Sequence, residues 1–313
     1  MIRIVLSVVC FALILLVAPG VRAGEVMIPG SHDVLLPVEG DDPAVRLLVW
    51  VPEGDVPDGG YPVLYFFDGE QNFAALSSYA ENMAGRARRA GKAPAMLVGI
   101  TYPDGTYTLN QRIHDLTPYS ANGYDMPERP NKAPWQSLGG GDRYLDMITA
   151  RVQPYIRAHF PADPDRETLF GHSFGGMMVL HTLFTRQQAF DAYFAASPSI
   201  WFNNRQVKRE AEAMLAAASV AAPVPLYITV GEAEDAVSSW EAEPTPQLEA
   251  RKRWVAANRM VDNVADLVAL IAAQGEGIIT IDHDIIAGAD HGSVLPPSAY
   301  RAVMFAIDPV LPE

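Results

Sequence analysis

The sequence predicts an α/β protein whose mainly parallel sheet is covered by helices on both faces. Segments that look like short apolar strands alternate with helical segments almost throughout the 313 residues, a pattern typical of parallel sheets. One of these strands, 61–68 (YPVLYFFD), is apolar up to its last residue, as expected of a strand buried on both faces. Hydrophobic residues make up 49% of the chain, which is enough for a large core.

The predicted elements follow one another as such a sheet requires. Short apolar runs bounded by Pro, Gly and Asp predict strands over 45–52, 61–68, 93–101, 168–173, 190–199, 225–235 and 278–288. Helical spacing of apolar residues predicts helices over 72–90, 141–160, 174–186 and 246–274, and one from about Pro297. The opening strands have only short connections, so we expect an antiparallel N-terminal edge.

Residues 102–138 are predicted to form a long loop. They are rich in Pro, Tyr, Asn and Gly and show no regular period. A loop of this length is usually functional or disordered, and its four tyrosines and Trp135 favour a function. Sheets of this class carry their active groups at the carboxyl ends of the strands, so the loops that follow strands are where we look for a site.

The N-terminus is predicted to be a secretory signal peptide, residues 1–23. Arg3 precedes an apolar run that Pro19 and Gly20 break, and Val21-Arg22-Ala23 offers small residues at the cleavage positions, with cleavage after Ala23. The alternative is an uncleaved membrane anchor. Cleavage would leave residues 24–313 as a single α/β domain, periplasmic or secreted.

Composition excludes several classes of partner and chemistry. The formal net charge of −14 argues against nucleic acid or an anionic membrane as the main partner. Cys10, the only cysteine, lies in the apolar N-terminal segment, so the exported chain would have no disulfide, thiol nucleophile or Cys-ligated zinc. We expect a small-molecule substrate, no metal or organic cofactor, and contact with a membrane only through the signal segment.

One serine stands between glycines where a predicted strand gives way to a helix. Residues 171–175, G-H-S-F-G, match the pattern G-x-S-x-G, in which a sharp strand-to-helix turn exposes a nucleophilic serine. Glycines let such a turn form without Cβ clashes, and the helix N-terminus favours negative charge that develops nearby. Ser173 is the predicted nucleophile, and the alternative is an inert serine in a glycine-rich turn.

The serine hydroxyl needs a base to take its proton. The candidates are His32, His114, His159, His172, His181, His283 and His291. In this layout the order is serine, acid, histidine, which leaves only the last two. His283 lies inside a predicted strand, whereas His291 lies in the glycine-rich loop beyond it, so His291 is the predicted base. His172 adjoins the serine, but we expect its side chain to point the other way and to pack against or support the site residues.

The acid that orients the imidazole should follow a strand between Ser173 and His291. The end of the sixth predicted strand segment, in LYITVGEAED, supplies Glu232, Glu234 and Asp235. Serine hydrolases of this layout often have Gly-x-x-acid after the strand, which selects Glu234. Glu232 and Asp235 remain the alternatives.

The oxyanion of an acyl-transfer intermediate needs two donors. One is the backbone N–H of Phe174, directly after the serine. The second should come from the loop after an earlier strand, and the N–H of Glu70 is the candidate because Gly69 allows a tight backbone turn. The alternative is an ordinary Asp-Gly turn.

Six segments carry a family resemblance: YPVLYFFDGEQNF, DLTPYS, GGGDRYLDMITARVQPYIRAHFPADPDRETLFGHSFGGMMVLHTLF, AASPSIWF, VGEAED and DHGSVLPPSAY. Together they resemble the Putative esterase family of α/β hydrolases, which includes siderophore esterases, esterase D-like S-formylglutathione hydrolases and mycolyltransferases. The match covers most of the chain and is closest to the siderophore-esterase branch. It implies an α/β-hydrolase fold without a large lid domain, and a serine esterase with Ser173 and His291 as its core pair.

Two further residues are candidates for contact with the substrate. Arg112 falls where relatives often carry Arg ahead of Asp-Leu-Thr-Pro, and it could meet an anionic or catecholate substrate. Alternatively, it pairs with Asp115 and pins the loop. Trp201 could form a wall of the pocket or pack in the core.

The prediction is therefore a serine carboxylesterase that works through an acyl-enzyme, with siderophore-type lactones among its candidate substrates. An acyltransferase that uses the same serine is one alternative. A catalytically silent binding protein on a hydrolase scaffold is the other.

Overall fold

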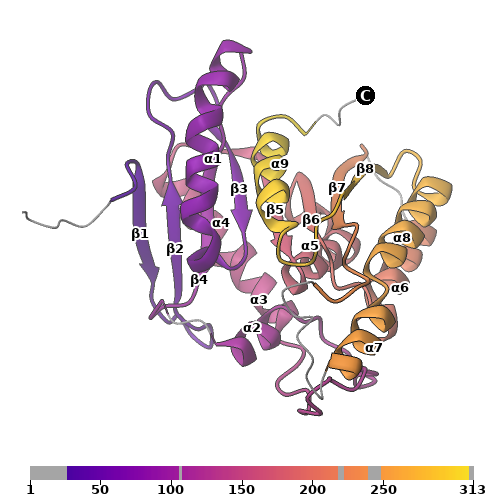
Figure 1. The fold of residues 1–313 in the computed structure, drawn as a ribbon. Coiled ribbons are helices and arrows are strands. Elements are labelled where there is room, and N and C mark those ends of the chain that lie inside the picture. Colours follow the sequence, from indigo (N-terminus) through magenta and orange to yellow (C-terminus); the bar gives the residue numbers. More distant parts are fainter. Residues whose placement is uncertain (1–26, 106–107, 218–221, 239–247, 310–313) are drawn as a thin grey trace, which may run out of the picture.

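The computed structural model describes residues 27–105, 108–217, 222–238 and 248–309. Eight strands of these residues form one sheet in the order β1-β2-β4-β3-β5-β6-β7-β8 (Figure 1). The strands are β1 (Ser31–Leu36), β2 (Val45–Trp50), β3 (Tyr61–Phe66), β4 (Met96–Thr101), β5 (Ala162–His172), β6 (Ala192–Ala196), β7 (Val224–Gly231) and β8 (Ile279–Ile286).

The pairing of the strands confirms the predicted sheet. β1 pairs with β2 and β2 with β4 in antiparallel fashion, whereas every pair from β4 through β3 to β8 is parallel. The antiparallel edge is therefore at the N-terminal side, as expected. The inner strands β3 and β4 are buried along their whole length, which is why their sequences are continuously apolar.

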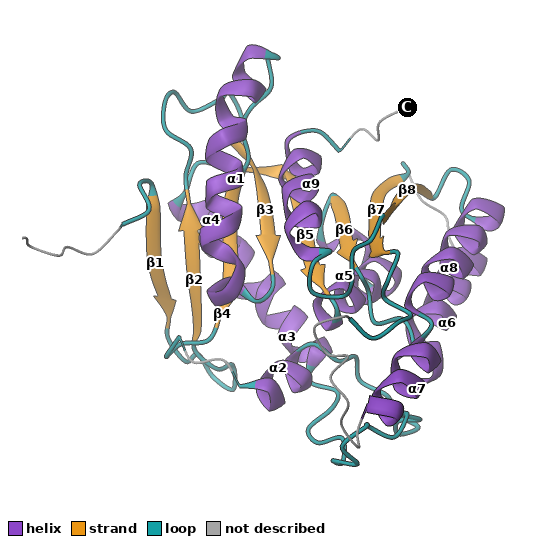
Figure 2. Ribbon diagram, viewed as in Figure 1, coloured by secondary structure: helices purple, strands orange, loops and turns teal. Residues whose placement is uncertain are grey.

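Helices cover both faces of the sheet (Figure 2). One face packs on α1 and α9, whereas the other packs on the helices from α3 to α6 and on α8. The helices are α1 (Gly69–Arg89), α2 (Leu109–Asp115), α3 (Gly141–Met147), α4 (Gln153–His159), α5 (Phe174–Thr185), α6 (Phe202–Ala217), α7 (Leu248–Asn258), α8 (Met260–Gln274) and α9 (Leu295–Ile307). The loops after the parallel strands gather at one edge, the lower edge in Figure 2.

The segment 102–138 is not wholly a loop, because it contains the short helix α2. The side chain of Thr108 accepts the backbone N–H of Gln111 and so caps this helix. A helix of seven residues is too short for its apolar spacing to stand out in the sequence, although its cap is visible there.

Two other predictions of elements need correction. The single helix expected over 246–274 is two helices, α7 and α8, because Arg259 between them adopts a left-handed conformation with φ 46°. The segment 141–160 is helical as predicted, but a π turn (Ile148–Val152) separates α3 from α4. Strand β1 and helix α6 were not predicted.

The described residues contain no helix that is long and apolar enough to cross a membrane. The predicted signal peptide, with Cys10, lies outside the described residues.

Candidate active site

Ser173 occupies a strained turn between β5 and α5. Its backbone has φ 62° and ψ −117°, a region that side-chain-bearing residues rarely enter. The neighbouring glycines allow close backbone approach: a Cβ on Gly171 would lie 2.4 Å from the carbonyl carbon of Gly175, and one on Gly176 would lie 2.6 Å from the Ala196 oxygen. The strain is therefore at the serine, and the glycines provide the space that the turn needs.

The structure brings Ser173, His291 and Glu234 together in one line of hydrogen bonds. His291 Nε2 lies 2.9 Å from Ser173 Oγ, and its Nδ1 lies 2.6 Å from Glu234 Oε2. The three residues follow β5, β8 and β7, whose carboxyl ends meet at one edge of the sheet. Of the three candidate acids, Glu234 carries the hydrogen bond to the imidazole, while Glu232 accepts the N–H of Gly288.

Two donors fix the buried carboxylate of Glu234, and one of them, Ser197, was not among the predicted site residues. Its Oε1 accepts the backbone N–H of Gly231, 2.7 Å away, and the hydroxyl of Ser197. Ser197 is fully buried, has φ 41°, and donates its own N–H to the Thr229 oxygen. One signal was available: Ser197 follows the buried strand β6, which ends beside β7 at the same edge.

His172 lies against the predicted base. Its ring centroid is 4.7 Å from that of His291, with 37° between the ring planes. Burial, followed by the charges of His291 and Arg112, holds the pKa of His172 well below its usual value. A neutral ring therefore supports the face of the His291 imidazole, in keeping with the packing role that we expected.

The two predicted oxyanion donors are both at helix starts. Phe174 is the first residue of α5 and Glu70 the second of α1, positions where the backbone N–H has no acceptor within its helix. The residue with positive φ is Asp68, at 57°, and not Gly69. Gly69 is needed for another reason, because a Cβ there would lie 2.8 Å from the carbonyl carbon of Gly99.

Arg112 is buried beneath this pair of loops. Its guanidinium forms a bidentate ion pair with Asp68, with N···O distances of 2.6 and 2.7 Å, and donates to the His172 carbonyl at 3.2 Å. The alternative partner Asp115 lies instead against the ring of His114. Arg112 thus links the loop that carries Glu70 to the turn that carries the serine.

A cleft of about 460 Å³ opens beside Ser173 and His291. Aromatic rings form much of its lining: Trp135, Phe174, Trp201 and Trp254. Trp201 contacts the other three rings at centroid distances of 5.6 to 6.0 Å, and it also packs on the core beneath. Trp201 therefore serves both of the roles that the sequence left open.

Two guanidinium groups accompany the aromatic rings of the cleft. Arg129 lies 3.8 Å from the centre of the Trp135 ring, and Arg251, which lines the cleft, lies 5.2 Å from that of Trp254. The cleft therefore combines apolar stacking surface with positive charge. Among the described residues, no group of three or more His, Cys, Asp or Glu side chains is placed to hold a metal ion.

Comparisons with known proteins agree with this fold. Residues 43–267 match the model of the family described as Putative esterase. The chain is 32% identical over 292 residues to the siderophore triacetylfusarinine C esterase of Aspergillus fumigatus, covering 91% of this chain and 95% of that protein. It is 33% identical over 266 residues to the siderophore enterobactin esterase of Emericella nidulans, covering 82% of this chain and 86% of that protein.

A solved structure extends the likeness to three dimensions. The siderophore hydrolase EstB from Aspergillus nidulans superposes with a TM-score of 0.79 at 30% identity, covering 93% of this chain and 100% of that one. The fold and the family together define an α/β hydrolase that cleaves esters. The chain belongs to the Putative esterase family.

Proposed function

We propose that this esterase hydrolyses the ester bonds of siderophore-type lactones by way of an acyl-enzyme on Ser173. The observation that carries the proposal is the line of hydrogen bonds from Ser173 through His291 to the buried Glu234, opening on an aromatic cleft. The names of the relatives supply the substrate class, since both are siderophore esterases.

In the first half of the reaction, Ser173 Oγ attacks the ester carbonyl carbon while His291 Nε2 takes the hydroxyl proton. The carbonyl oxygen becomes an oxyanion, which the N–H groups of Phe174 and Glu70 would stabilise. When the tetrahedral intermediate collapses, the C–O bond to the alcohol breaks. His291 returns its proton to the departing alkoxide, which leaves the acyl group on the serine.

In the second half, water replaces the alcohol. His291 takes a proton from the water as its oxygen attacks the acyl carbon, and then gives this proton to Ser173 Oγ as the C–O bond to the serine breaks. Glu234 accepts the hydrogen bond of Nδ1 throughout, so it fixes the tautomer and stabilises the imidazolium. The products are a carboxylic acid and the free enzyme.

The lining of the cleft supports a large ester as the substrate. Its volume of about 460 Å³ is in the range of small-molecule sites. Trp135, Trp201 and Trp254 offer flat apolar surface. A ferric siderophore lactone presents flat iron-binding groups around a metal, some classes with net negative charge, and such groups would stack on these rings.

We also propose that residues 1–23 are a signal peptide and that the remainder works in the periplasm or outside the cell. The support is the charged start, the apolar run and the small residues at the cleavage positions within Val21-Arg22-Ala23. A mass spectrum of the protein exported from an expressing cell tests this: a first residue of Gly24 is expected, and retention of the apolar run would reject it.

A substrate panel tests the proposed function. Purified protein is offered the ferric complexes of triacetylfusarinine C and enterobactin, together with p-nitrophenyl butyrate. We expect hydrolysis of at least one siderophore lactone, and loss of about 10⁴-fold or more in kcat for the Ser173→Ala variant. Turnover of the p-nitrophenyl ester alone would reject the siderophore assignment, and activity that survives in the variant would reject the serine mechanism.

The same panel separates the remaining alternatives. Transfer of the acyl group to an added alcohol in place of water would identify an acyltransferase, and binding without turnover of any ester would identify a silent binding protein. The names of the relatives, which are esterases and hydrolases, favour neither alternative.

A further inference from the structure

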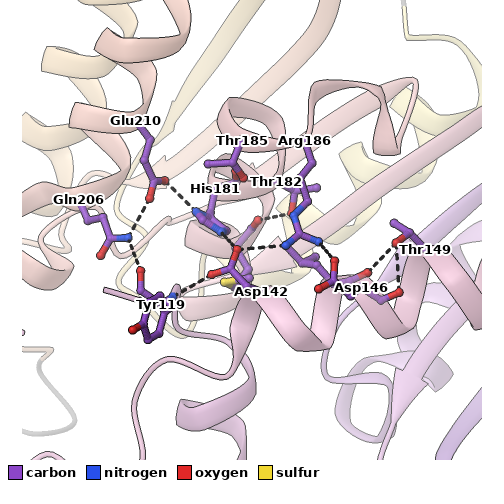
Figure 3. A network of polar contacts seen from close by, with 12 residues as sticks. Tyr119, Asp142, Asp146, Thr149, His181, Thr182, Thr185, Arg186, Gln206 and Glu210 are labelled. Atoms are coloured by element: carbon purple, nitrogen blue, oxygen red, sulfur yellow. Dashed lines mark hydrogen bonds and ion pairs between the residues drawn. The ribbon is translucent and has the colours of Figure 1, made fainter. Parts of the chain in front are cut away.

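A second histidine, outside the active site, is held between two carboxylates. His181 lies on α5, two turns after the nucleophile, and is only 3% exposed. Its Nδ1 is 2.8 Å from Glu210 of α6, and its Nε2 is 3.3 Å from Asp142 of α3 (Figure 3). One imidazole therefore ties three helices together.

The geometry requires this imidazole to be charged. A neutral ring has a single N–H, so one of the two carboxylates would face a lone pair. As an imidazolium, the ring donates to both. Burial lowers the pKa of His181, but the hydrogen bonds to Asp142 and Glu210 outweigh it and raise the pKa to about 9. Arg186, the residue directly after the same helix, supplies a second cation to Asp142 and also pairs with Asp146.

The same two carboxylates lead to the backbone of Tyr119. Asp142 Oδ2 accepts the Tyr119 N–H at 3.0 Å. Gln206 donates to the Tyr119 carbonyl at 3.1 Å and to Glu210 Oε1 at 2.8 Å (Figure 3). Because the Tyr119 side chain is 63% exposed, these contacts hold the main chain at this point and not the ring.

A second point of the same segment is held by the neighbouring Asn203. Its side-chain oxygen accepts the N–H of Asp125 at 2.8 Å, and its amide donates to Gln206 at 2.7 Å. Asn203 is buried and has φ 45°, the first of three successive residues in the left-handed region. A left-handed turn in non-glycine residues is strained and persists only where surrounding contacts hold it. The two hydrogen bonds of the Asn203 side chain are such contacts.

The segment held in this way continues to the wall of the cleft. Trp135 donates its indole N–H to the Pro127 carbonyl at 2.8 Å. Its ring lies 6.4 Å from that of Phe174 and lines the cleft with Ser173. The contacts at Tyr119 and Asp125 thus fix the chain that leads to an aromatic wall of the site.

We propose that His181, Asp142, Glu210 and Gln206 form a polar clamp that fixes segment 119–135 as a wall of the cleft and so sets the affinity for large esters. The proposal rests on the proposed function, because it concerns the substrate of the same site. The residues of the polar clamp do not touch the reacting atoms, so they are positioning residues. Small esters that need only the serine turn should be indifferent to them.

The experiment compares two substrates in three variants. His181→Gln removes the cation, Gln206→Ala removes the link to Tyr119 without a change of charge, and Glu212→Gln, on the exposed side of α6, is the control. For the two clamp variants we expect KM for the ferric lactone to rise about tenfold while kcat/KM for p-nitrophenyl acetate stays within about twofold. The control should change neither value.

The pH dependence adds a readout that a purely structural role would not give. Between pH 7 and 10, the KM of the wild type for the lactone should rise as His181 loses its proton, and that of His181→Gln should stay flat. Equal losses on both esters in the clamp variants, or no change on either, would overturn the proposal. Both variants are compared below their melting temperatures.

Hydrogen exchange keeps this test separate from that of the proposed function. Amides in 119–127 should exchange faster in His181→Gln and Gln206→Ala than in the wild type, while those of β5 should not change. If the wild type hydrolyses no siderophore lactone, the proposed function fails, and the exchange data still decide whether the polar clamp holds its segment. Unaltered exchange in 119–127 would reject the polar clamp even in an active esterase.

Discussion

His291 and His181 are both hydrogen-bonded to carboxylates, yet their surroundings suit them to opposite tasks. The side chain of His291 is 45% exposed and shares its two nitrogens between a carboxylate and a serine hydroxyl. His181 is buried and has a carboxylate on each nitrogen. A hydroxyl on the second nitrogen leaves a lone pair that can take a proton, whereas a second carboxylate holds the ring as a cation.

The comparison shows that a buried His–carboxylate pair alone does not identify an active site. What distinguishes the two histidines is the group that contacts the second ring nitrogen, a hydroxyl or a second carboxylate, and the exposure of the ring to solvent. Both histidines are associated with helix α5. His291 contacts Ser173 at the start of the helix, and His181 lies on the helix near its end. On the two proposals above, one helix serves chemistry at its N-terminus and positioning near its C-terminus.

Removal of each imidazole should separate the two tasks most sharply. His291→Ala is expected to lower kcat for a p-nitrophenyl ester by about 10⁴-fold or more, since the serine loses its base. The melting temperature should change by no more than about 2 °C because the ring is half exposed. His181→Gln should do the reverse, with a large loss of stability and small loss of turnover. Calorimetry and ester assays on both variants check this, and parallel losses in the two would contradict it.

The neighbouring acids Glu234 and Glu232 provide the next largest contrast. Glu234→Gln places an amide opposite His291 Nδ1 and favours the wrong tautomer, so kcat should fall by about 10²- to 10⁴-fold. Glu232→Gln is the matched control, because among the described residues that carboxylate accepts only the exposed N–H of Gly288, in the loop after β8. Its kcat should stay within about twofold of the wild type. A larger loss of kcat in the Glu232 variant than in the Glu234 variant would show that Glu234 is not the acid.

The sequence was sufficient to select the three side chains that the structure joins by hydrogen bonds. Ser173 is marked by a local motif, His291 by chain order, and Glu234 by its spacing from Gly231. Their catalytic roles stay predictions until the variants are measured. The sheet could be predicted as well, because the inner strands are continuous apolar runs, which are a local pattern in the sequence.

What the sequence did not indicate depends on contacts between distant segments. Ser197 meets a carboxylate 37 residues away, and it adopts a positive φ without being glycine. His181 lies in an apolar helix, where nothing local predicts that carboxylates 29 and 39 residues away will meet it. The break at Arg259 is similar, since the residue takes a left-handed conformation although no Gly or Pro stands at the junction.

The stability of the protein should depend on pH through His181. Its pKa is about 9 in the folded state against 6.5 unfolded, so its contribution is complete below pH 6.5 and is lost as pH rises through 9. The shift corresponds to about 3 kcal/mol. The hydrogen bond from His181 also lowers the pKa of Asp142. The contribution of Asp142 to the free energy of unfolding is therefore lost on the acid side, as pH falls below about 4.

Urea unfolding at pH 6.5 and pH 10 checks this prediction. The free energy of unfolding of the wild type should fall by about 3 kcal/mol more between these values than that of His181→Gln. His291→Ala is the matched control, because its ring is half exposed and should leave the wild-type dependence unchanged. Equal slopes in the wild type and His181→Gln would mean that His181 is not a buried cation.

The smallest expected effect concerns the support of the triad acid. Ser197→Ala removes one of the two donors to Glu234 Oε1, which should cost about 1 kcal/mol of stability and lower kcat about tenfold. Residue 197 has positive φ, and because alanine carries a Cβ as serine does, Ser197→Ala keeps the backbone strain while it removes the hydroxyl. Ser197→Gly lacks the hydroxyl but tolerates this backbone. If the hydroxyl holds the carboxylate, both variants lose kcat alike, whereas a wild-type kcat in Ser197→Ala would show that the hydroxyl is not needed, and a loss confined to glycine would show that the turn matters.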